Sequence, residues 1–178
     1  MRDRLITLVR QLSYRRMRVT LASGRESDFY VDGKQTTLNA EGAWLVGNLV
    51  LDALHPDVVG VGGLVIGADP IAAATAAVSF HRGRPVHAFL VRKEAKGHGT
   101  AKYVEGRNSL PDGSAVCVVE DTTTTGGSLL QAVDRATAEG LRVVQCLTIV
   151  DREEGAAAAI AARGLPFTSL IRRSELEA

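Results

Sequence analysis

Length, composition and charge first restrict the class of protein. The chain has 178 residues, enough for one domain with a full hydrophobic core but not for two large domains. Its 21 Lys and Arg side chains nearly balance its 20 Asp and Glu side chains, which excludes the basic field of a nonspecific nucleic-acid binder. The sequence shows neither a signal-peptide pattern after Met1 nor an apolar stretch long enough for a membrane span. We therefore expect a cytoplasmic protein with no nucleic-acid or membrane partner.

The four histidines and two cysteines do not pair at metal-ligand spacing. Cys117 and Cys146 both lie in apolar runs, where a buried reduced thiol is the ordinary outcome. We expect no structural zinc site and no metal held by protein side chains alone.

Residues 1–38 predict a helix followed by a small hood. Apolar side chains fall on one face of a helix over about residues 1–14. Two extended runs follow, at residues 18–21 and 28–32, with the turn signal Ser23-Gly24-Arg25 between them. We expect this section to cover one side of the main sheet.

Residues 39–178 alternate between strand and helix patterns, which indicates βαβ units. The chain is therefore predicted to be a single α/β domain, in which a mostly parallel sheet of about five strands is flanked by helices. The expected strands are residues 58–61, 86–91, 115–119, 143–150 and 167–171, and the expected helices are residues 39–54, 69–80, 128–139 and 156–162.

The most informative segment joins a strand to a helix. Residues 115–119 are small and apolar without polar alternation, which is typical of a strand covered on both faces. Glu120 and Asp121 follow at its C-terminal end, where open α/β sheets bind ligands and where carboxylates can accept hydrogen bonds from a diol. Four threonines and two glycines then lead into a helix, whose free N–H groups favour phosphate.

No lysine follows the glycines, which argues against a Walker nucleotide loop and favours a ribose-phosphate site. The alternative is a strand-to-helix turn whose threonines only cap the helix.

Two further charged segments follow strand ends. The segment at residues 91–106 mixes cations with glycines, which suits a mobile lid that brings positive charge to an anion, although a solvated surface loop is the alternative. After the strand at 143–150, Arg152 can bind a carboxylate bidentately, unless it only forms salt bridges within its own loop. The cations of the first segment are Arg92, Lys93, Lys96, His98 and Lys102.

The segment from Glu120 to Ser128 resembles the phosphoribosyl pyrophosphate motif of type I phosphoribosyltransferases. Residues 92–99 resemble the catalytic loop of the orotate phosphoribosyltransferases, with its Arg-Lys-Glu-x-x-Lys-x-His-Gly pattern. Residues 23–32 resemble the N-terminal hood of that family, and residues 61–70 resemble its pyrophosphate loop. The resemblance covers about residues 10–155.

This resemblance implies the type I phosphoribosyltransferase fold and the orotate phosphoribosyltransferase reaction. That reaction transfers ribose 5-phosphate from 5-phospho-α-D-ribose 1-diphosphate to orotate, giving orotidine 5′-phosphate and diphosphate in de novo UMP synthesis. The resemblance also implies Mg²⁺ as the cofactor, and a homodimer whose catalytic loop reaches the active site of the neighbouring subunit.

By the same resemblance, Lys96, His98 and Asp121 are the expected catalytic residues. Orotate is expected to bind Thr124 and Arg152. The predicted donor-binding residues are Arg92, Lys93, Lys96, His98, Glu120, Asp121, Thr122, Thr123, Thr124, Thr125, Gly126, Gly127 and Ser128.

Two positions depart from the family pattern, because Ala22 and Gly67 stand where many relatives carry a lysine that contacts the donor. This puts the affinity for the donor in question, and Arg25 or Lys34 are the candidates to compensate.

Three alternatives stay open at the level of the sequence. Phe29 and Tyr30 either stack on orotate or only pack the hood. The chain could serve another base, such as a purine. It could also be a noncatalytic regulator that senses the donor, although such a protein would be expected to have lost the loop cations.

Overall fold

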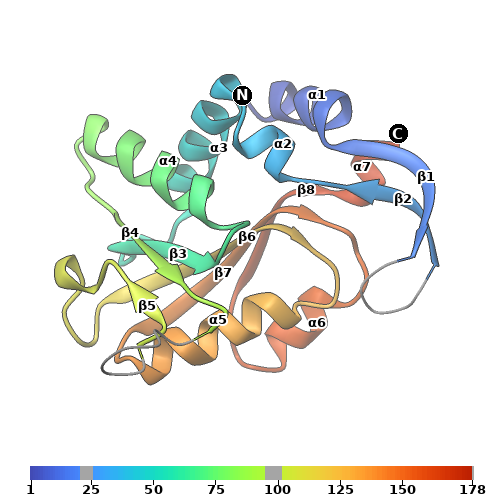
Figure 1. Ribbon diagram of the computed structural model, residues 1–178. Helices are drawn as coiled ribbons and strands as arrows, with labels where there is room; N and C mark the ends of the chain where they lie inside the picture. The colour runs from blue at the N-terminus through green and yellow to red at the C-terminus, as the bar shows by residue number, and fades with distance from the viewer. Residues whose placement is uncertain (21–25, 95–101, 178) are drawn as a thin grey trace.

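The computed structural model describes residues 1–20, 26–94 and 102–177. Its centre is a six-stranded sheet in the order β5-β4-β3-β6-β7-β8, with helices on both faces (Figure 1). All neighbouring strands pair in parallel except β5, which is antiparallel to β4. The strands are β3 (Gly60–Leu64), β4 (His87–Val91), β5 (Val104–Glu105), β6 (Ala115–Thr123), β7 (Arg142–Asp151) and β8 (Phe167–Arg172).

The predicted α/β fold with a mostly parallel sheet is confirmed, with two corrections. The sheet has a sixth strand, β5, whose two residues are too few to leave a periodic pattern. Strand β6 also continues beyond Val119, because Thr122 and Thr123 still pair with β7. Glu120 and Asp121 therefore lie within the last residues of strand β6 and not after its end.

The helices form two layers that cover opposite faces of the sheet (Figure 1). Strand β6 alternates between them: Cys117 packs into the cluster that contains α3 and α4, and Val118 packs into the cluster on the α5 side. Burial on both faces explains its apolar run. The helices are α1 (Arg2–Leu12), α2 (Lys34–Thr37), α3 (Ala40–Ala53), α4 (Asp69–His81), α5 (Gly127–Ala138), α6 (Ala156–Ala161) and α7 (Arg173–Glu177), with a 3₁₀ turn, η1, at Arg107–Ser109.

Helix α3 begins as the sequence predicts, since the Asn39 side-chain oxygen accepts a hydrogen bond from the Gly42 N–H at 3.1 Å. The helix also packs closely on α4, because a Cβ at Gly47 would lie 2.8 Å from the Ala74 carbonyl oxygen. No helix in the described ranges is both long enough and apolar enough to cross a membrane.

The N-terminal section combines one core helix with a small two-stranded sheet. Helix α1 buries Leu5 and Val9 in the same hydrophobic cluster as α3. Strands β1 (Tyr14–Thr20) and β2 (Glu26–Val31) pair antiparallel and lie beside the end of β8 (Figure 1). The predicted organisation, a single domain with a hood section at residues 1–38 and an α/β core at residues 39–178, stays a prediction.

Candidate active site

The ends of β6 and β7 bring the predicted donor and orotate residues together. Their parallel pairing sets Thr123 opposite Asp151, and the Arg152 N–H donates to the Thr123 carbonyl oxygen at 2.9 Å. The Ala156 N–H donates to the Thr124 carbonyl oxygen at 3.2 Å. The Glu120–Ser128 segment and the loop after β7 therefore lie side by side.

The turn from β6 into α5 has the geometry of an anion cradle. Helix α5 starts at Gly127, one residue earlier than the sequence predicts, and its N-cap is Gly126 with φ of 85°. No side chain caps the helix, so the reading in which the threonines only cap it is not supported. Thr122 Oγ1 is buried without a hydrogen-bond partner among the described residues. The first N–H groups of α5 and these hydroxyls are thus suited to bind a phosphate.

The carboxylate of Asp121 is enclosed by two glycines and one cation. A Cβ at Gly33 would lie 2.8 Å from Asp121 Cβ, and a Cβ at Gly67 would lie 2.6 Å from Asp121 Oδ1. Lys34 Nζ lies 3.7 Å from Asp121 Oδ2 and 2.7 Å from Asp32 Oδ1. A side chain at position 67 would therefore have to shift the Asp121 carboxylate.

Burial in this corner disfavours the ionised form of both acids. Burial raises the pKa of Glu120 from 4.5 to about 7, and the charge of Asp121 adds to the rise, while hydrogen bonds from Ser128 and Thr123 and the charge of Lys93 oppose it. Burial also raises the pKa of Asp121, against the opposing charge of Lys34. A ligand that brings hydroxyl donors or positive charge would therefore stabilise the ionised form of both carboxyl groups.

A buried hydroxyl supports Glu120 from the neighbouring strand. Thr148 on β7 lies opposite Glu120, and its Oγ1 is 3.2 Å from the Glu120 carbonyl oxygen and 3.0 Å from Thr123 Oγ1. Thr148 was not predicted as a site residue, although its place opposite Glu120 on the adjacent strand is a usable signal. Asp32, which precedes Lys34 by two residues, was not predicted either.

Arg152 is placed at this corner by aromatic packing. Its guanidinium lies 4.2 Å from the centre of the Phe29 ring, and the Arg173 guanidinium lies 4.0 Å from the same ring. Arg152 also pairs with Glu154 at 2.8 Å and is only 4% exposed. Phe29 is 1% exposed and packs in the hydrophobic cluster that contains α1 and α3, whereas Tyr30 is 41% exposed.

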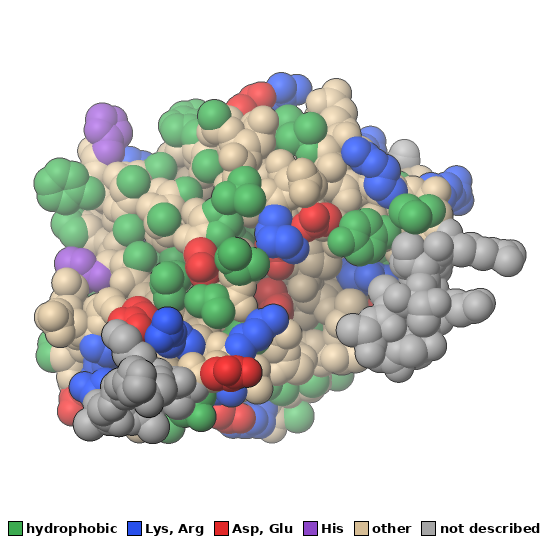
Figure 2. Space-filling view, in the orientation of Figure 1, with side chains coloured by type: hydrophobic (Ala, Val, Ile, Leu, Met, Phe, Trp, Pro, Cys, Tyr) green, Lys and Arg blue, Asp and Glu red, His purple; other side chains and the backbone are tan. Residues whose placement is uncertain are grey.

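The described part of the cationic segment supplies two of its predicted residues. Arg92 Nη1 lies 3.6 Å from Glu105 Oε1, and Lys93 is exposed and acts electrostatically on Glu120. Lys96 and His98, like Ala22 and Arg25, lie outside the described residues. Figure 2 shows acidic and basic side chains mixed across the middle of the face that carries this corner.

Two curated proteins that are similar to this chain over almost its full length carry the same name. The curated orotate phosphoribosyltransferase of Thermosynechococcus vestitus is 48% identical over 178 residues, covering 100% of this chain and 94% of that protein. The enzyme of the same name from Sorangium cellulosum is 47% identical over 176 residues, covering 98% and 92%. The chain belongs to the orotate phosphoribosyltransferase family. No family model matches it.

Solved structures agree with this assignment. The orotate phosphoribosyltransferase of Mycobacterium tuberculosis, in complex with Fe(III) dicitrate, superimposes with a TM-score of 0.87 at 46% identity, covering 99% of both chains. The same enzyme in complex with 5-phospho-alpha-D-ribosyl 1-diphosphate gives a TM-score of 0.82 at 43% identity, covering 99% of both chains. The adenine phosphoribosyltransferase of Leishmania tarentolae, at 17% identity, a TM-score of 0.67 and coverage of 96% and 88%, shares the fold alone. The predicted family, fold and enzyme class are therefore confirmed, while the roles of single residues stay predictions.

Proposed function

We propose that this orotate phosphoribosyltransferase family member transfers ribose 5-phosphate from 5-phospho-α-D-ribose 1-diphosphate to orotate, in de novo UMP synthesis. The observation that carries the proposal is the pair of half-buried Glu120 and buried Asp121, which the threonine run joins to the uncapped start of α5. An acid pair followed by free helix N–H groups fits a sugar diol attached to a phosphate. The relatives of known name support orotate as the acceptor.

The roles divide by position around the reacting carbon. Glu120 and Asp121 accept hydrogen bonds from the ribose hydroxyls and stabilise a sugar that becomes cation-like. The cradle from Thr122 to Ser128 holds the 5′-phosphate. A ring nitrogen of orotate loses its proton to diphosphate or solvent and forms the bond to C1. The bond from C1 to the diphosphate oxygen breaks at the same time, and the electron pair of that broken bond leaves with diphosphate. Holding both reactants in this geometry lowers the barrier.

Orotate is held in the proposal by Arg152 and Thr124. The guanidinium of Arg152 is already oriented by the Phe29 ring and contacts a carboxylate, that of Glu154. The carboxylate of orotate is a chemical equivalent of that partner. Binding would then exchange one carboxylate for another, without a buried cation ever being left unpaired.

The diphosphate that leaves is neutralised by Arg92, Lys93, Lys96 and His98. Negative charge grows on the leaving group during the transfer, so fixed cations beside it stabilise the transition state more than the ground state. Of the four, Arg92 and Lys93 lie in the described part of the chain, on the residues that directly follow β4.

Mg²⁺ is the proposed cofactor, and the donor set fits its usual mode of binding. Among the described residues no group of three or more His, Cys, Asp or Glu could hold a metal ion. Mg²⁺ commonly binds through one or two carboxylates together with substrate phosphates, so Glu120 and Asp121 with the donor are sufficient. The ion would supply positive charge to the diphosphate and to the ribose hydroxyls.

Lys34 is the proposed substitute for the lysines that this chain lacks at Ala22 and Gly67. Its ammonium group lies at the acid pair, 3.7 Å from Asp121. The hydrogen bond to Asp32 raises the pKa of Lys34, although burial opposes this, so the group stays charged. The Lys34 ammonium group is thus present beside Asp121, the residue that a side chain at position 67 would also meet.

The proposal includes a cytoplasmic homodimer with shared active sites. Several large apolar side chains among the described residues are exposed on the chain alone, and a second copy would cover such surface. They include Leu38 at 71%, Trp44 at 56%, Ile66 at 67% and Phe80 at 77%.

The test follows orotate consumption by absorbance in the presence of the donor and Mg²⁺. We expect turnover by the wild type, strong loss in Lys96→Ala, and no turnover when adenine replaces orotate. A folded wild type that consumes no orotate would contradict the proposed function. Unchanged turnover by Lys96→Ala would contradict only the role given to the cationic segment.

A further inference from the structure

Two side chains near the end of α5 hold both ends of the cationic segment. The Arg135 guanidinium donates to the Arg92 carbonyl oxygen at 2.6 Å and lies 4.5 Å from the centre of the Tyr103 ring. Glu139, four residues later on the same face of the helix, accepts hydrogen bonds from the N–H groups of Tyr103 and Val104, the second at 2.9 Å. The Arg92 N–H also donates to the Tyr103 carbonyl oxygen at 2.8 Å.

The end of α5 is itself fixed. The Gly140 N–H donates to the Thr137 carbonyl oxygen and the Leu141 N–H to the Ala136 carbonyl oxygen, both at 3.0 Å, which is a Schellman motif. Gly140 has φ of 86°, and a Cβ there would lie 2.7 Å from Asp112 Oδ1. The hydrogen-bond pattern and the glycine together set the direction in which the Glu139 side chain leaves the helix.

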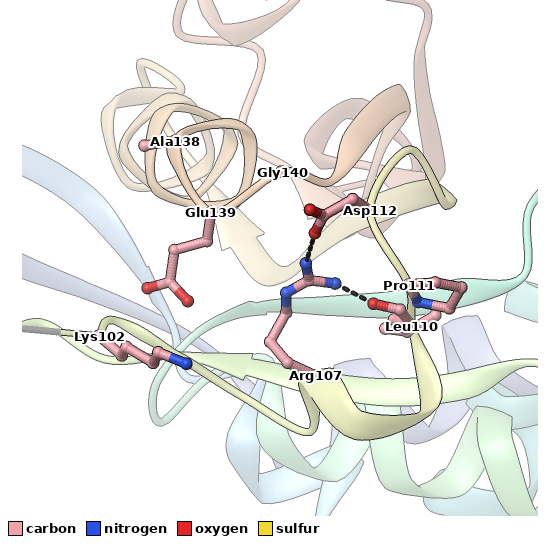
Figure 3. A pocket seen from close by; sticks show the side chains of 8 residues that line it. All are labelled: Lys102, Arg107, Leu110, Pro111, Asp112, Ala138, Glu139 and Gly140. Carbon is pink, nitrogen blue, oxygen red and sulfur yellow. Dashed lines mark hydrogen bonds and ion pairs between the residues drawn. The ribbon is translucent and has the colours of Figure 1, made fainter. Parts of the chain in front are cut away.

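The neighbouring pocket has a volume of about 610 Å³ and leaves Glu139 accessible between Lys102 and Arg107 (Figure 3). Arg107 is committed to Asp112 at 2.5 Å and to the Leu110 carbonyl oxygen. A carboxylate is electrostatically disfavoured at the C-terminal end of a helix. The hydrogen bonds that Glu139 accepts from the Tyr103 and Val104 N–H groups offset this unfavourable interaction.

Helix α5 therefore connects two parts of the proposed site. Its first turn follows the phosphate cradle, and its last turn holds the backbone on both sides of the cationic segment. Resting on the proposed function, we propose that Arg135 and Glu139 are positioning residues, which set where Lys93 stands relative to the acid pair and the donor held at the start of the same helix.

Steady-state kinetics of Arg135→Ala test this role. We expect kcat/KM for the donor to fall about tenfold, with a raised KM for the donor and an unchanged KM for orotate. Because Arg135 acts through the cations, the double variant Arg135→Ala/Lys93→Ala should lose little more than Lys93→Ala alone. Gln131→Ala, an exposed position on the same helix, is the matched control and should match the wild type.

Glu139 gives a second test that does not depend on Arg135→Ala folding. Glu139→Gln keeps an oxygen acceptor for the two N–H groups and should retain the donor KM, whereas Glu139→Ala should raise it. Equal loss of kcat in all variants with unchanged KM values, or additive effects in the double variant, would overturn the positioning role. If the folded wild type does not turn over orotate, the proposed function fails. Titration of inorganic diphosphate into the wild type and Arg135→Ala then still decides the inference, since equal affinities would overturn it.

Discussion

The ionisation of Glu120 ties the chemistry of the site to the stability of the protein. Folding raises its pKa from 4.5 to about 7, mainly through burial and then through Asp121, so the folded protein binds this proton more tightly than the unfolded chain. The resulting stability is fully present below the unfolded pKa and is lost as the pH rises through the folded pKa. At neutral pH and above, ionisation of Glu120 therefore lowers the free energy of unfolding. The ionised carboxylate can then accept hydrogen bonds from a ligand.

Glu120→Gln should accordingly become more stable than the wild type as the pH rises. We expect the variant's advantage in the free energy of unfolding to grow by about 2 kcal/mol between about pH 5 and pH 8, because Gln cannot ionise. Urea unfolding at both pH values measures this. A constant difference between the two proteins would show that burial does not raise this pKa. The same variant should lose transfer activity.

Lys34→Ala tests whether this cation replaces the missing family lysines. We expect a raised KM for the donor and an unchanged KM for orotate, because the ammonium group lies beside Asp121 and not beside Arg152. Lys34→Arg keeps the charge and serves as the control. Identical donor KM values in all three proteins would remove Lys34 from the site.

Several contacts at the residue scale could not be predicted from the sequence. The acid pair and the hydroxyl run were visible as a motif, but the enclosure of Asp121 by Gly33 and Gly67 depends on contacts between segments far apart in the chain. The stacking of Arg152 on Phe29 likewise joins the end of β7 to the hood. No local pattern encodes either contact.

At the scale of the element, the turn between β6 and α5 separates two uses of glycine. Gly126 has φ of 85° and would place a Cβ 3.4 Å from Ala156 Cα, so it is required by the backbone conformation. Gly127 begins the helix, and a Cβ there would meet only Thr125 Oγ1, at 3.9 Å. Its lack of a side chain leaves space for a ligand.

The two corresponding alanine variants should therefore behave differently. Gly126→Ala should lose about 1–2 kcal/mol of stability, because L-residues are strained in this region. Gly127→Ala should keep its stability and bind the donor more weakly. Urea unfolding and calorimetric titration with the donor distinguish the two effects. Wild-type donor affinity in a stable Gly127→Ala would show that the phosphate does not approach the helix there.

Periodic patterns predicted most elements of this fold. The short helices α2 and α7 were not predicted, and two further errors occur where pairing extends or creates a strand. The apolar run at residues 115–119 predicted strand β6. Hydrogen bonding to β7 extends this strand four residues past Val119, to Thr123. The two residues of β5 become a strand only because they return to β4. Such boundaries depend on the partner strand and not on the residues themselves.

At the scale of the whole molecule, the family relationship predicts a dimer in which each site also uses residues of the other subunit's cationic segment, Lys96 among them. Lys96→Ala and Asp121→Asn should each be inactive alone. In an equal mixture, half of the dimers would be mixed and would carry one intact site, so about one quarter of wild-type activity should return. Sedimentation verifies that all samples are dimers. Mixing and refolding without any recovery would contradict shared sites.

The central claim is that the acid pair at the end of β6 holds the donor for transfer to orotate. The most direct measurement is the turnover of orotate, with the donor and Mg²⁺, by the wild type and by Glu120→Gln/Asp121→Asn, whose folding is verified by circular dichroism. We predict turnover by the wild type and a loss of at least about a hundredfold in the variant, because neutral amides cannot stabilise the positive charge on the sugar. Equal turnover by the two proteins, or none by the folded wild type, would contradict the claim.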